Sequence, residues 1–316
     1  MKFSLADKAD MVSLLSLIQA LYPNLGWTKD YMEWHYFENP AGQAKVWMCQ
    51  DQGRAVGSVT AVPHRVWTRD RCTLGYRVQD VLTHPDYRGK SIYRTLSEEC
   101  YAFLDDQENG VHFTFPNENS DRVFRTSRWF PIGEIPLWSA KPLAPKTRYE
   151  LLKNFELVDS FTNRDYEVWQ SFRTSGLIGL DKSADFLNWK YFKNPRVKYK
   201  CYRIAYKEWR AVLILKKFRL ETGKVIFHLC DVFYSEFIEN LLQKVIDFVH
   251  LRAASENAAS ITTWASPMDE LVELLPGAGF SYTPVKTRSY FLRFTNPVIR
   301  EDFAKWNIKM GDSDVY

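Results

Sequence analysis

The sequence has few cysteines, almost no net charge and no long apolar run, and each scarcity excludes a class of protein. Its five cysteines are scattered among 316 residues and never form a C-x-x-C pair, so neither a disulfide framework nor a structural zinc or other metal site is expected. A formal net charge of only +4 gives no electrostatic case for binding nucleic acid or an anionic membrane surface. No apolar stretch reaches the roughly eighteen residues of a membrane span. We therefore expect a protein of the reducing cytoplasm.

Aromatic side chains are abundant instead. They make up 16% of the chain, which favours broad packed sheets or an aromatic-lined cleft. Apolar residues account for 46% and charged residues for 25%, so the chain can bury a core and is not disordered by composition. Its length allows two domains of ordinary size. The stretch at residues 11–22 has apolar residues at helical spacing after two aspartates, and we interpret it as an amphipathic helix rather than a signal segment.

A seven-residue motif occurs twice, at an offset of 155 residues. Residues 34–40 read W-H-Y-F-E-N-P and residues 189–195 read W-K-Y-F-K-N-P. Internal repeats of this kind indicate duplicated structural units. We interpret both copies as core anchors that end a helix, with aromatic side chains that could also line an acceptor pocket.

The order of predicted elements repeats around these motifs. Each copy is followed by a pair of strand patterns, and each pair by a strand that carries Asp-Val, at Asp80 and at Asp231. A segment rich in Pro, Lys and Arg separates the halves. The sequence therefore predicts an α+β protein of two modules, residues 1–140 and residues 154–316.

The most informative segment is residues 76–96. An apolar strand pattern runs to His84 and Pro85, a basic loop follows at residues 88–91 (R-G-K-S), and a helical pattern begins at Ile92. The first turn of a helix has unpaired amides and a partial positive charge, and a glycine lets those amides approach an anion. Arginine and lysine add full charges. Strand, basic loop and helix start together predict a phosphate site.

Residues 81–93 (V-L-T-H-P-D-Y-R-G-K-S-I-Y) resemble the acyl-CoA loop of the GNAT superfamily of N-acetyltransferases. That family has a strand ending in V-x-x-P-x-x-R, followed by Q/R-x-x-G-x-G/A. Together with the repeat, the chain resembles the tandem GNAT enzymes that acetylate aminoglycosides and mycothiol. The resemblance implies two GNAT-like modules, each a mixed, mostly antiparallel sheet flanked by helices. It also implies acetyl-CoA or another acyl-CoA as donor, with an acyl carrier protein as a possible substitute.

The resemblance assigns binding roles residue by residue. Backbone groups of one strand would pair with the pantetheine arm, the loop and helix start would hold the pyrophosphate, and a later loop would contact the cofactor through asparagine. These three groups are Val81, Leu82 and Thr83; Arg88, Gly89, Lys90, Ser91, Ile92 and Tyr93; and Asn117 and Asn119.

Several positions depart from the family pattern. Ser91 stands where the family prefers its first glycine, and Tyr93 where it prefers Gly or Ala. Arg125 occupies the position of the tyrosine that often protonates the departing thiolate, so another group or water would take that role. In the second half, residues 235–239 (S-E-F-I-E) replace the basic loop, and two carboxylates would repel a pyrophosphate. We therefore expect only the first module to bind acyl-CoA.

Two carboxylates are candidate bases. N-acyl transfer needs a neutral amine, and a free alkyl amine with a pKa of about 10.4 is mostly protonated at neutral pH. Asp80 lies on the strand beside the expected thioester, and Glu118 lies in the loop after the next strand. An amide near Leu82 could polarise the thioester carbonyl. The predicted reaction is direct transfer, in a ternary complex, to the primary amine of a small molecule such as an amino sugar or amino acid.

Two other interpretations remain open at this point. An aminoacyl-tRNA-dependent transferase of the peptidoglycan-bridge type also has two GNAT-like modules, but that family lacks the basic loop. A non-catalytic acyl-CoA-binding or scaffold protein is compatible with the substituted glycines and the missing tyrosine. Release of CoA in the presence of amines separates an enzyme from a scaffold. The sequence does not indicate the oligomeric state.

Overall fold

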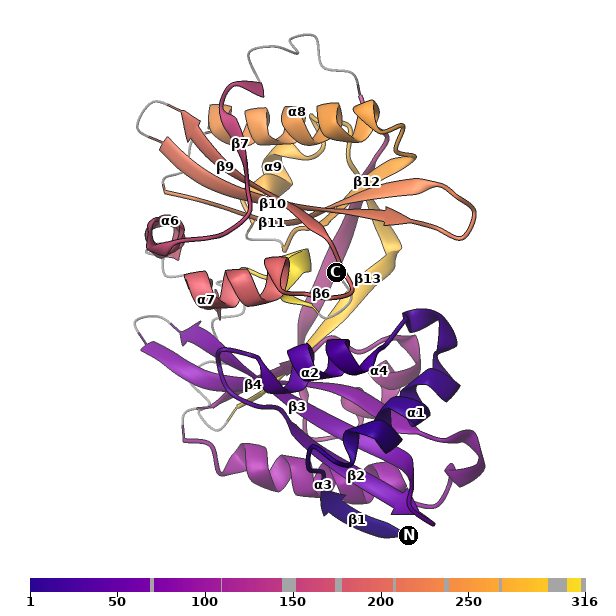
Figure 1. The fold of residues 1–316 in the computed structure, drawn as a ribbon. Helices are drawn as coiled ribbons and strands as arrows, with labels where there is room; N and C mark the ends of the chain where they lie inside the picture. Colours follow the sequence, from indigo (N-terminus) through magenta and orange to yellow (C-terminus); the bar gives the residue numbers. More distant parts are fainter. Residues whose placement is uncertain are drawn as a thin grey trace.

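A computed structural model of the chain, shown in Figure 1, describes most of its length. The residues that it describes are 1–68, 71–108, 110–143, 152–173, 178–206, 209–235, 239–266, 269–294 and 306–313.

The first half of the chain alternates strands and helices as the sequence predicts. Its elements are β1 (Lys2–Leu5), α1 (Met11–Leu21), η1 (Pro23–Leu25), α2 (Lys29–Phe37), β2 (Lys45–Asp51), β3 (Arg54–Thr68), β4 (Arg71–Thr83), η2 (Pro85–Tyr87), α3 (Ile92–Asp105), β5 (Val111–Thr114), α4 (Glu118–Arg125) and β6 (Phe130–Ala140). Apolar residues of α1 and α2 cover one face of this sheet, and those of α3 cover the other face.

The second half repeats the pattern. Its elements are β7 (Phe155–Val158), α6 (Asn163–Arg173), β8 (Gly179–Leu180), α7 (Ala184–Leu187), η3 (Asn188–Phe192), β9 (Tyr199–Tyr206), β10 (Trp209–Arg219), β11 (Val225–Tyr234), α8 (Glu239–Ser255), β12 (Ser260–Trp264), α9 (Leu271–Leu274), β13 (Ser281–Phe294) and η5 (Met310–Asp312). In each half one neighbouring strand pair is parallel, β4 with β5 and β11 with β12. The other pairs that link these strands are antiparallel, so the predicted mixed, mostly antiparallel sheets are confirmed.

The two halves exchange strands. The described strands follow the order β1-β2-β3-β4-β5-β13-β6-β12-β11-β10-β9-β7. Thus β13, from the second half, pairs with β5 of the first, while β6 continues from the first half to pair with β12 of the second. Figure 1 shows these two long strands running between the halves. This exchange was not predicted from the sequence.

The repeated motifs lie face to face where the halves meet. The indoles of Trp34 and Trp189 stack with ring centroids 4.7 Å apart. Trp34 Nε1 donates to the carbonyl of Trp189 at 2.8 Å, and Trp189 Nε1 donates to the carbonyl of Trp34 at 3.0 Å. Both indoles are buried, so the predicted role as core anchors is confirmed. The reciprocal bonds give this contact a local two-fold arrangement.

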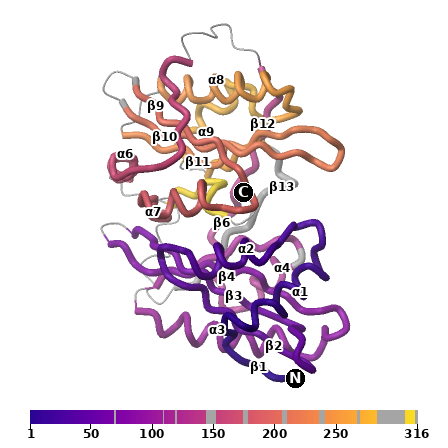
Figure 2. Tube along the Cα trace, viewed as in Figure 1, coloured from indigo at the N-terminus to yellow at the C-terminus, as the bar shows by residue number. Residues whose placement is uncertain are grey.

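The segment 306–313 lies between the two halves (Figure 2). Trp306, Ile308 and Met310 are buried in the core that both halves share. The carbonyl of Asp312 accepts a hydrogen bond from Arg77 in β4, and its carboxylate binds Lys182. This segment therefore contacts the central strands of both halves.

Candidate functional site

A β-bulge in β4 places Asp80 in the site. The register between β3 and β4 shifts between Ser58 and Thr60, which pair with Leu82 and Gln79. Asp80 takes a left-handed backbone conformation with φ of 49°, which aspartate tolerates better than most residues. Because a bulge breaks the alternation of side chains along a strand, the neighbours Gln79 and Asp80 point the same way and bond to each other.

The Asp80 carboxylate accepts hydrogen bonds from Tyr36 and Gln79. The Tyr36 hydroxyl and Gln79 Nε2 each donate to its Oδ2, both at 2.8 Å. Burial, followed by the charge of Asp80, raises the pKa of Tyr36 well above its ordinary value, so the phenol stays protonated and keeps donating. Asp80 is only half-buried. It is thus fixed in position while part of its surface stays accessible.

A polar chain extends from Asp80 into the space between the halves. Arg77 Nε donates to Gln79 Oε1 at 2.7 Å, and Gln79 Nε2 lies 2.5 Å from His35 Nε2. Arg77 and His35 are both buried. Tyr36, Gln79, Arg77 and His35 were not identified from the sequence. The repeated motif contains two of them, but it gave no sign that they contact the strand that carries Asp80.

The basic loop before α3 is open to solvent. Arg88, Gly89, Lys90 and Ser91 are all exposed. Gly89 has φ of 78° and would have no atom within 4 Å of an added Cβ. The first turn of α3 has no intrahelical acceptors for its amides, and the residues beside it do not fill the space over Gly89. This geometry fits a pyrophosphate on the helix start, as the resemblance implies.

The two substituted positions are compatible with that geometry. Ser91 lies just before α3 with φ of 58°, a conformation typical of glycine that serine adopts at an energetic cost. The Tyr93 hydroxyl lies 3.2 Å from the Tyr101 hydroxyl, two turns further along α3. The bulk of Tyr93 therefore extends along the helix and not over the loop.

The edge of β4 is free to bind an extended group. Its only register with β5 joins Arg77 to Phe113, so among the described residues no strand pairs with the β5-facing edge from Gln79 to Thr83. Val81 and Thr83 are half-buried and Leu82 is buried. Backbone groups on such an edge can pair with an added extended chain. Their proposed role toward the pantetheine arm remains a prediction.

The predicted site residues after β5 lie at and near the start of α4. Asn117 Oδ1 accepts from the Ser120 amide at 3.1 Å, so this side chain caps α4. Glu118 is exposed at the first position of α4. The side chain of Asn119 lies outside the described residues. Arg125 is paired with Asp121 in the same helix. These contacts do not test the predicted roles of Asn117 and Glu118.

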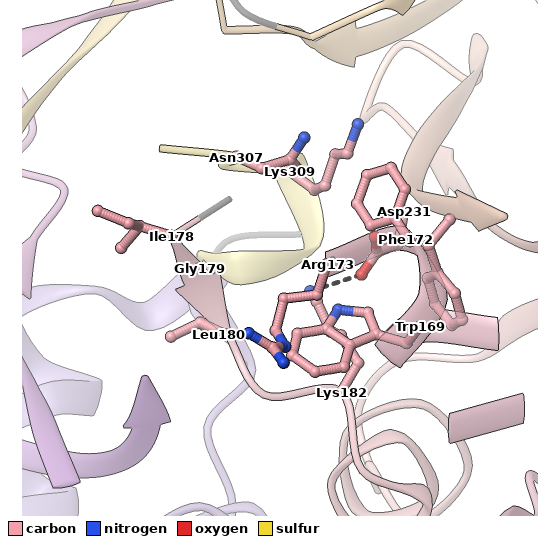
Figure 3. Close-up of a pocket in the computed structure, with 11 residues that line it drawn as sticks. Trp169, Phe172, Arg173, Ile178, Gly179, Leu180, Lys182, Asp231, Asn307 and Lys309 are labelled. Carbon is pink, nitrogen blue, oxygen red and sulfur yellow. Dashed lines mark hydrogen bonds and ion pairs between the residues drawn. The ribbon is translucent and has the colours of Figure 1, made fainter. Parts of the chain in front are cut away.

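In the second half, the aspartate that corresponds to Asp80 is in a different environment. Asp231 is 1% exposed and accepts from Lys182 Nζ at 2.7 Å and from the Tyr191 hydroxyl at 3.1 Å. Burial alone would lower the pKa of Lys182, but Asp231 and Asp312 raise it above its ordinary value. Figure 3 shows this ion pair beside a pocket that is lined mainly by the second half. The buried pair indicates a structural role for Asp231. Residues 236–238 of the replaced loop lie outside the described residues.

Two classes of site are missing from the part of the chain that the structure describes. It contains no cluster of three or more His, Cys, Asp or Glu side chains able to hold a metal ion. None of its helices is long and apolar enough to cross a membrane.

Comparison with known proteins agrees with this geometry. Residues 5–121 match the acetyltransferase (GNAT) domain family. No protein of curated function has a significantly similar sequence. A GCN5-related N-acetyltransferase from Anabaena variabilis ATCC 29413 has a similar structure, with a TM-score of 0.70 at 16% identity, covering 93% of this chain and 73% of that one.

Two further solved structures extend the comparison. A conserved protein of unknown function from Enterococcus faecalis V583, described as a probable N-acyltransferase, gives a TM-score of 0.66 at 15% identity, over 93% of this chain and 72% of that one. Saccharomyces cerevisiae N-myristoyltransferase with bound myristoyl-CoA gives a TM-score of 0.59 at 12% identity, over 93% of this chain and 78% of that one. At such identities these likenesses show the fold. Residues 5–121 therefore match the acetyltransferase (GNAT) domain family, and the fold of these solved structures extends over nearly the whole chain.

Proposed function

We propose that this protein transfers an acyl group from acyl-CoA, in the first place acetyl-CoA, to the primary amine of a small molecule. The observation that carries this proposal is the exposed loop at residues 88–91, with open space over Gly89 at the start of α3. The free edge of β4 and the carboxylate of Asp80 lie on the strand that leads into that loop. Donor site and candidate base therefore belong to one continuous strand–loop–helix unit.

The proposed reaction needs one proton transfer on each side. The protonated amine loses a proton to Asp80, directly or through water, and its neutral nitrogen then bonds to the acyl carbon. As the carbon–sulfur bond breaks, the second proton of that nitrogen passes through water to the sulfur, which leaves as the CoA thiol. Water or another group relays this proton, since Arg125 is paired with Asp121. Holding both substrates in one cleft supplies up to roughly 7–11 kcal/mol of the barrier reduction. The Leu82 amide is the proposed donor to the carbonyl oxygen, and Glu118 is the alternative base.

Reversing the charge of Arg88 tests the donor site. Arg88→Glu should weaken acetyl-CoA binding roughly tenfold or more, the effect of losing about one charge-assisted hydrogen bond and adding repulsion. Calorimetric titration of acetyl-CoA measures the dissociation constant. Arg219→Glu is a matched control, because Arg219 is exposed on β10 of the second half. Unchanged acetyl-CoA affinity in the Arg88 variant would contradict the proposed site.

A further inference from the structure

A second pocket lies where the two halves meet, beside the polar chain that ends at Asp80. It contains about 370 Å³ of space not occupied by atoms, part of which is open to solvent. The polar residues that line it include His35, His64, Arg77, Lys190, Arg196 and Ser313. No Asp or Glu is among its described lining residues. Among the described residues, the side chains that line the pocket therefore include three cations, two of them the guanidinium groups of Arg77 and Arg196.

Among the described residues, Arg77 donates hydrogen bonds to neutral acceptors. Its Nε donates to the amide oxygen of Gln79 and its Nη1 donates to the carbonyl of Asp312. Arg77 is 2% exposed, and a buried guanidinium is stable when an anion is nearby. Arg196, which is half-buried, donates to the Leu25 carbonyl and lies over the Tyr31 ring. Both arginines can thus still attract an anionic group.

The hydrogen-bond chain determines which nitrogen of His35 carries a proton. Because Arg77 can only donate, Gln79 Oε1 accepts and Gln79 Nε2 donates. His35 Nε2, 2.5 Å from that nitrogen, must therefore accept, which leaves the proton on Nδ1. His35 Nδ1 is buried without a hydrogen-bond partner. It is a donor available to a ligand.

His64 adds a second unsatisfied ring. It is 1% exposed, and neither of its nitrogens has a hydrogen-bond partner. Burial, followed by the charge of Arg77, lowers its pKa well below the ordinary value, so it is neutral and has one N–H to donate. Buried polar groups are normally paired. The unpaired Nδ1 of His35 and the unpaired ring nitrogens of His64, beside cations, indicate a site that a ligand with acceptor oxygens completes.

We propose that this inter-module pocket binds a carboxylate of the acceptor, so that the acceptor is a small amine that carries a carboxylate close to its amino group, such as an α-amino acid. This inference rests on the proposed function and narrows it. Gln79 joins the two ends of the acceptor site, since its Nε2 contacts both Asp80 Oδ2 and His35 Nε2. Asp80 Oδ2 and His35 Nε2 therefore lie within two hydrogen-bond lengths of each other. A carboxylate held by Arg77 would leave the adjoining amine near Asp80.

Binding of reaction products tests the pocket without requiring turnover. Calorimetric titration would compare N-acetyl derivatives of glycine, leucine, phenylalanine and tryptophan with the same compounds as carboxamides. At least one acid should bind roughly tenfold or more tightly than its amide, the worth of a charge-assisted pair. Nitrogen-15 spectra of the histidines should show the His64 ring signals moving with the acid and not with the amide. Equal affinities of every acid and amide, with no histidine shift, would overturn the inference.

Variants of Arg77 and Arg196 test whether these side chains cause the preference for the acid over the carboxamide. Arg196→Gln removes charge at a half-buried position and should reduce the acid-to-amide preference several-fold, and Arg77→Gln should reduce it further. Arg219→Gln, on the exposed face of β10, is the matched control and should leave it unchanged. Because Arg77 is buried, the Arg77→Gln result counts only if the denaturation midpoint of that variant stays near the wild-type value. If it does not, the Arg196→Gln result decides. A preference that survives in Arg196→Gln would overturn the assignment.

Turnover distinguishes this inference from the proposed function. If acids bind preferentially but acetyl-CoA with free amino acids releases no CoA, the pocket assignment is supported and the proposed reaction fails. If CoA is released equally with amino acids and with their carboxamides, the reaction is supported and the carboxylate site is overturned.

Discussion

At the scale of single residues, the two halves show what separates a candidate base from a structural carboxylate. Asp80 and Asp231 occupy matching strands, and each accepts from the tyrosine of its own repeated motif, Tyr36 or Tyr191. Asp231 also has Lys182 as a buried counter-charge, whereas Asp80 is bonded by the neutral amide of Gln79. A carboxylate that is half-buried and bonded to neutral donors can still accept a proton from a substrate.

The sequence could identify both aspartates but could not distinguish them. Asp-Val appears in each strand pattern, so the pairing with a tyrosine motif is visible as a repeat. Lys182 lies 49 residues before Asp231, in a segment with no signal of its own. Likewise, the bulge that turns Asp80 toward Gln79 depends on the register with β3, and register is not encoded by the local pattern of β4.

We expect the matched substitutions Asp80→Asn and Asp231→Asn to affect different properties, activity in the first case and stability in the second. Asp80→Asn should lower kcat/KM for the acceptor roughly 100-fold or more, the usual contribution of a general base, with little loss of stability because asparagine can still accept one bond. Asp231→Asn should lower the free energy of unfolding by about 3 kcal/mol, since it leaves Lys182 buried without one of its charge partners. CoA release assays and urea denaturation measure the two quantities. Full activity in Asp80→Asn would transfer the role to Glu118 or to water.

At the scale of elements, the repeated motif connects the halves as well as ending helices. The Asn of each copy is buried, and Asn39 donates to the Pro63 carbonyl while accepting from the Ala41 amide. The local bond from the Ala41 amide stabilises the turn after the helix, and the bond to Pro63 attaches that turn to β3. The stacking of Trp34 on Trp189 needs both copies at once. The sequence therefore predicted the burial of these residues but not that the two copies pack on each other.

Removing either indole should destabilise the whole protein. Trp34→Ala and Trp189→Ala should each lower the free energy of unfolding by about 3–5 kcal/mol, because each removes a buried aromatic and a hydrogen bond. The double variant should lose less than the sum, since the rings stack on each other. Tyr22→Ala, at a side chain 42% exposed, should change stability by no more than about 0.5 kcal/mol. Additive losses would show that the stack contributes no coupling.

At the scale of the whole molecule, the exchanged strands make each half depend on the other. The sequence predicted the helices and strands of each half from local periodicity, and even the strands β9 and β10 fall where the patterns place them. Partners such as Val111 and Phe294, by contrast, lie far apart in sequence and become neighbours only through β13. Such pairing is not visible in the local sequence pattern. The boundaries at residues 140 and 154 therefore remain a proposal for where the duplicated halves begin and end, and they do not imply that each half folds independently.

The exchange predicts that residues 1–140 do not fold alone. In this fragment the strand β5 keeps only its short pairing with β4, and β6 loses both of its neighbours, β13 and β12. The core shared by α2, η3 and residues 306–310 would also be exposed. Unpaired strand edges and apolar surface favour aggregation. Size-exclusion chromatography and urea denaturation of the fragment should therefore show association and no cooperative transition.

Grafting β13 onto the fragment tests whether the lost strand pairing or the exposed shared core causes its failure to fold. Ser139 in β6 pairs with Ser281 in β13 antiparallel, so a short Asn-Gly turn can join residue 140 to residues 280–294 as a hairpin in the same register. This graft restores the neighbour of β5 but leaves the shared core exposed. It should therefore reduce association without recovering the unfolding free energy of the full chain. A monomeric, cooperatively unfolding fragment without the graft would show that the strand exchange is dispensable and that the first module is an autonomous domain.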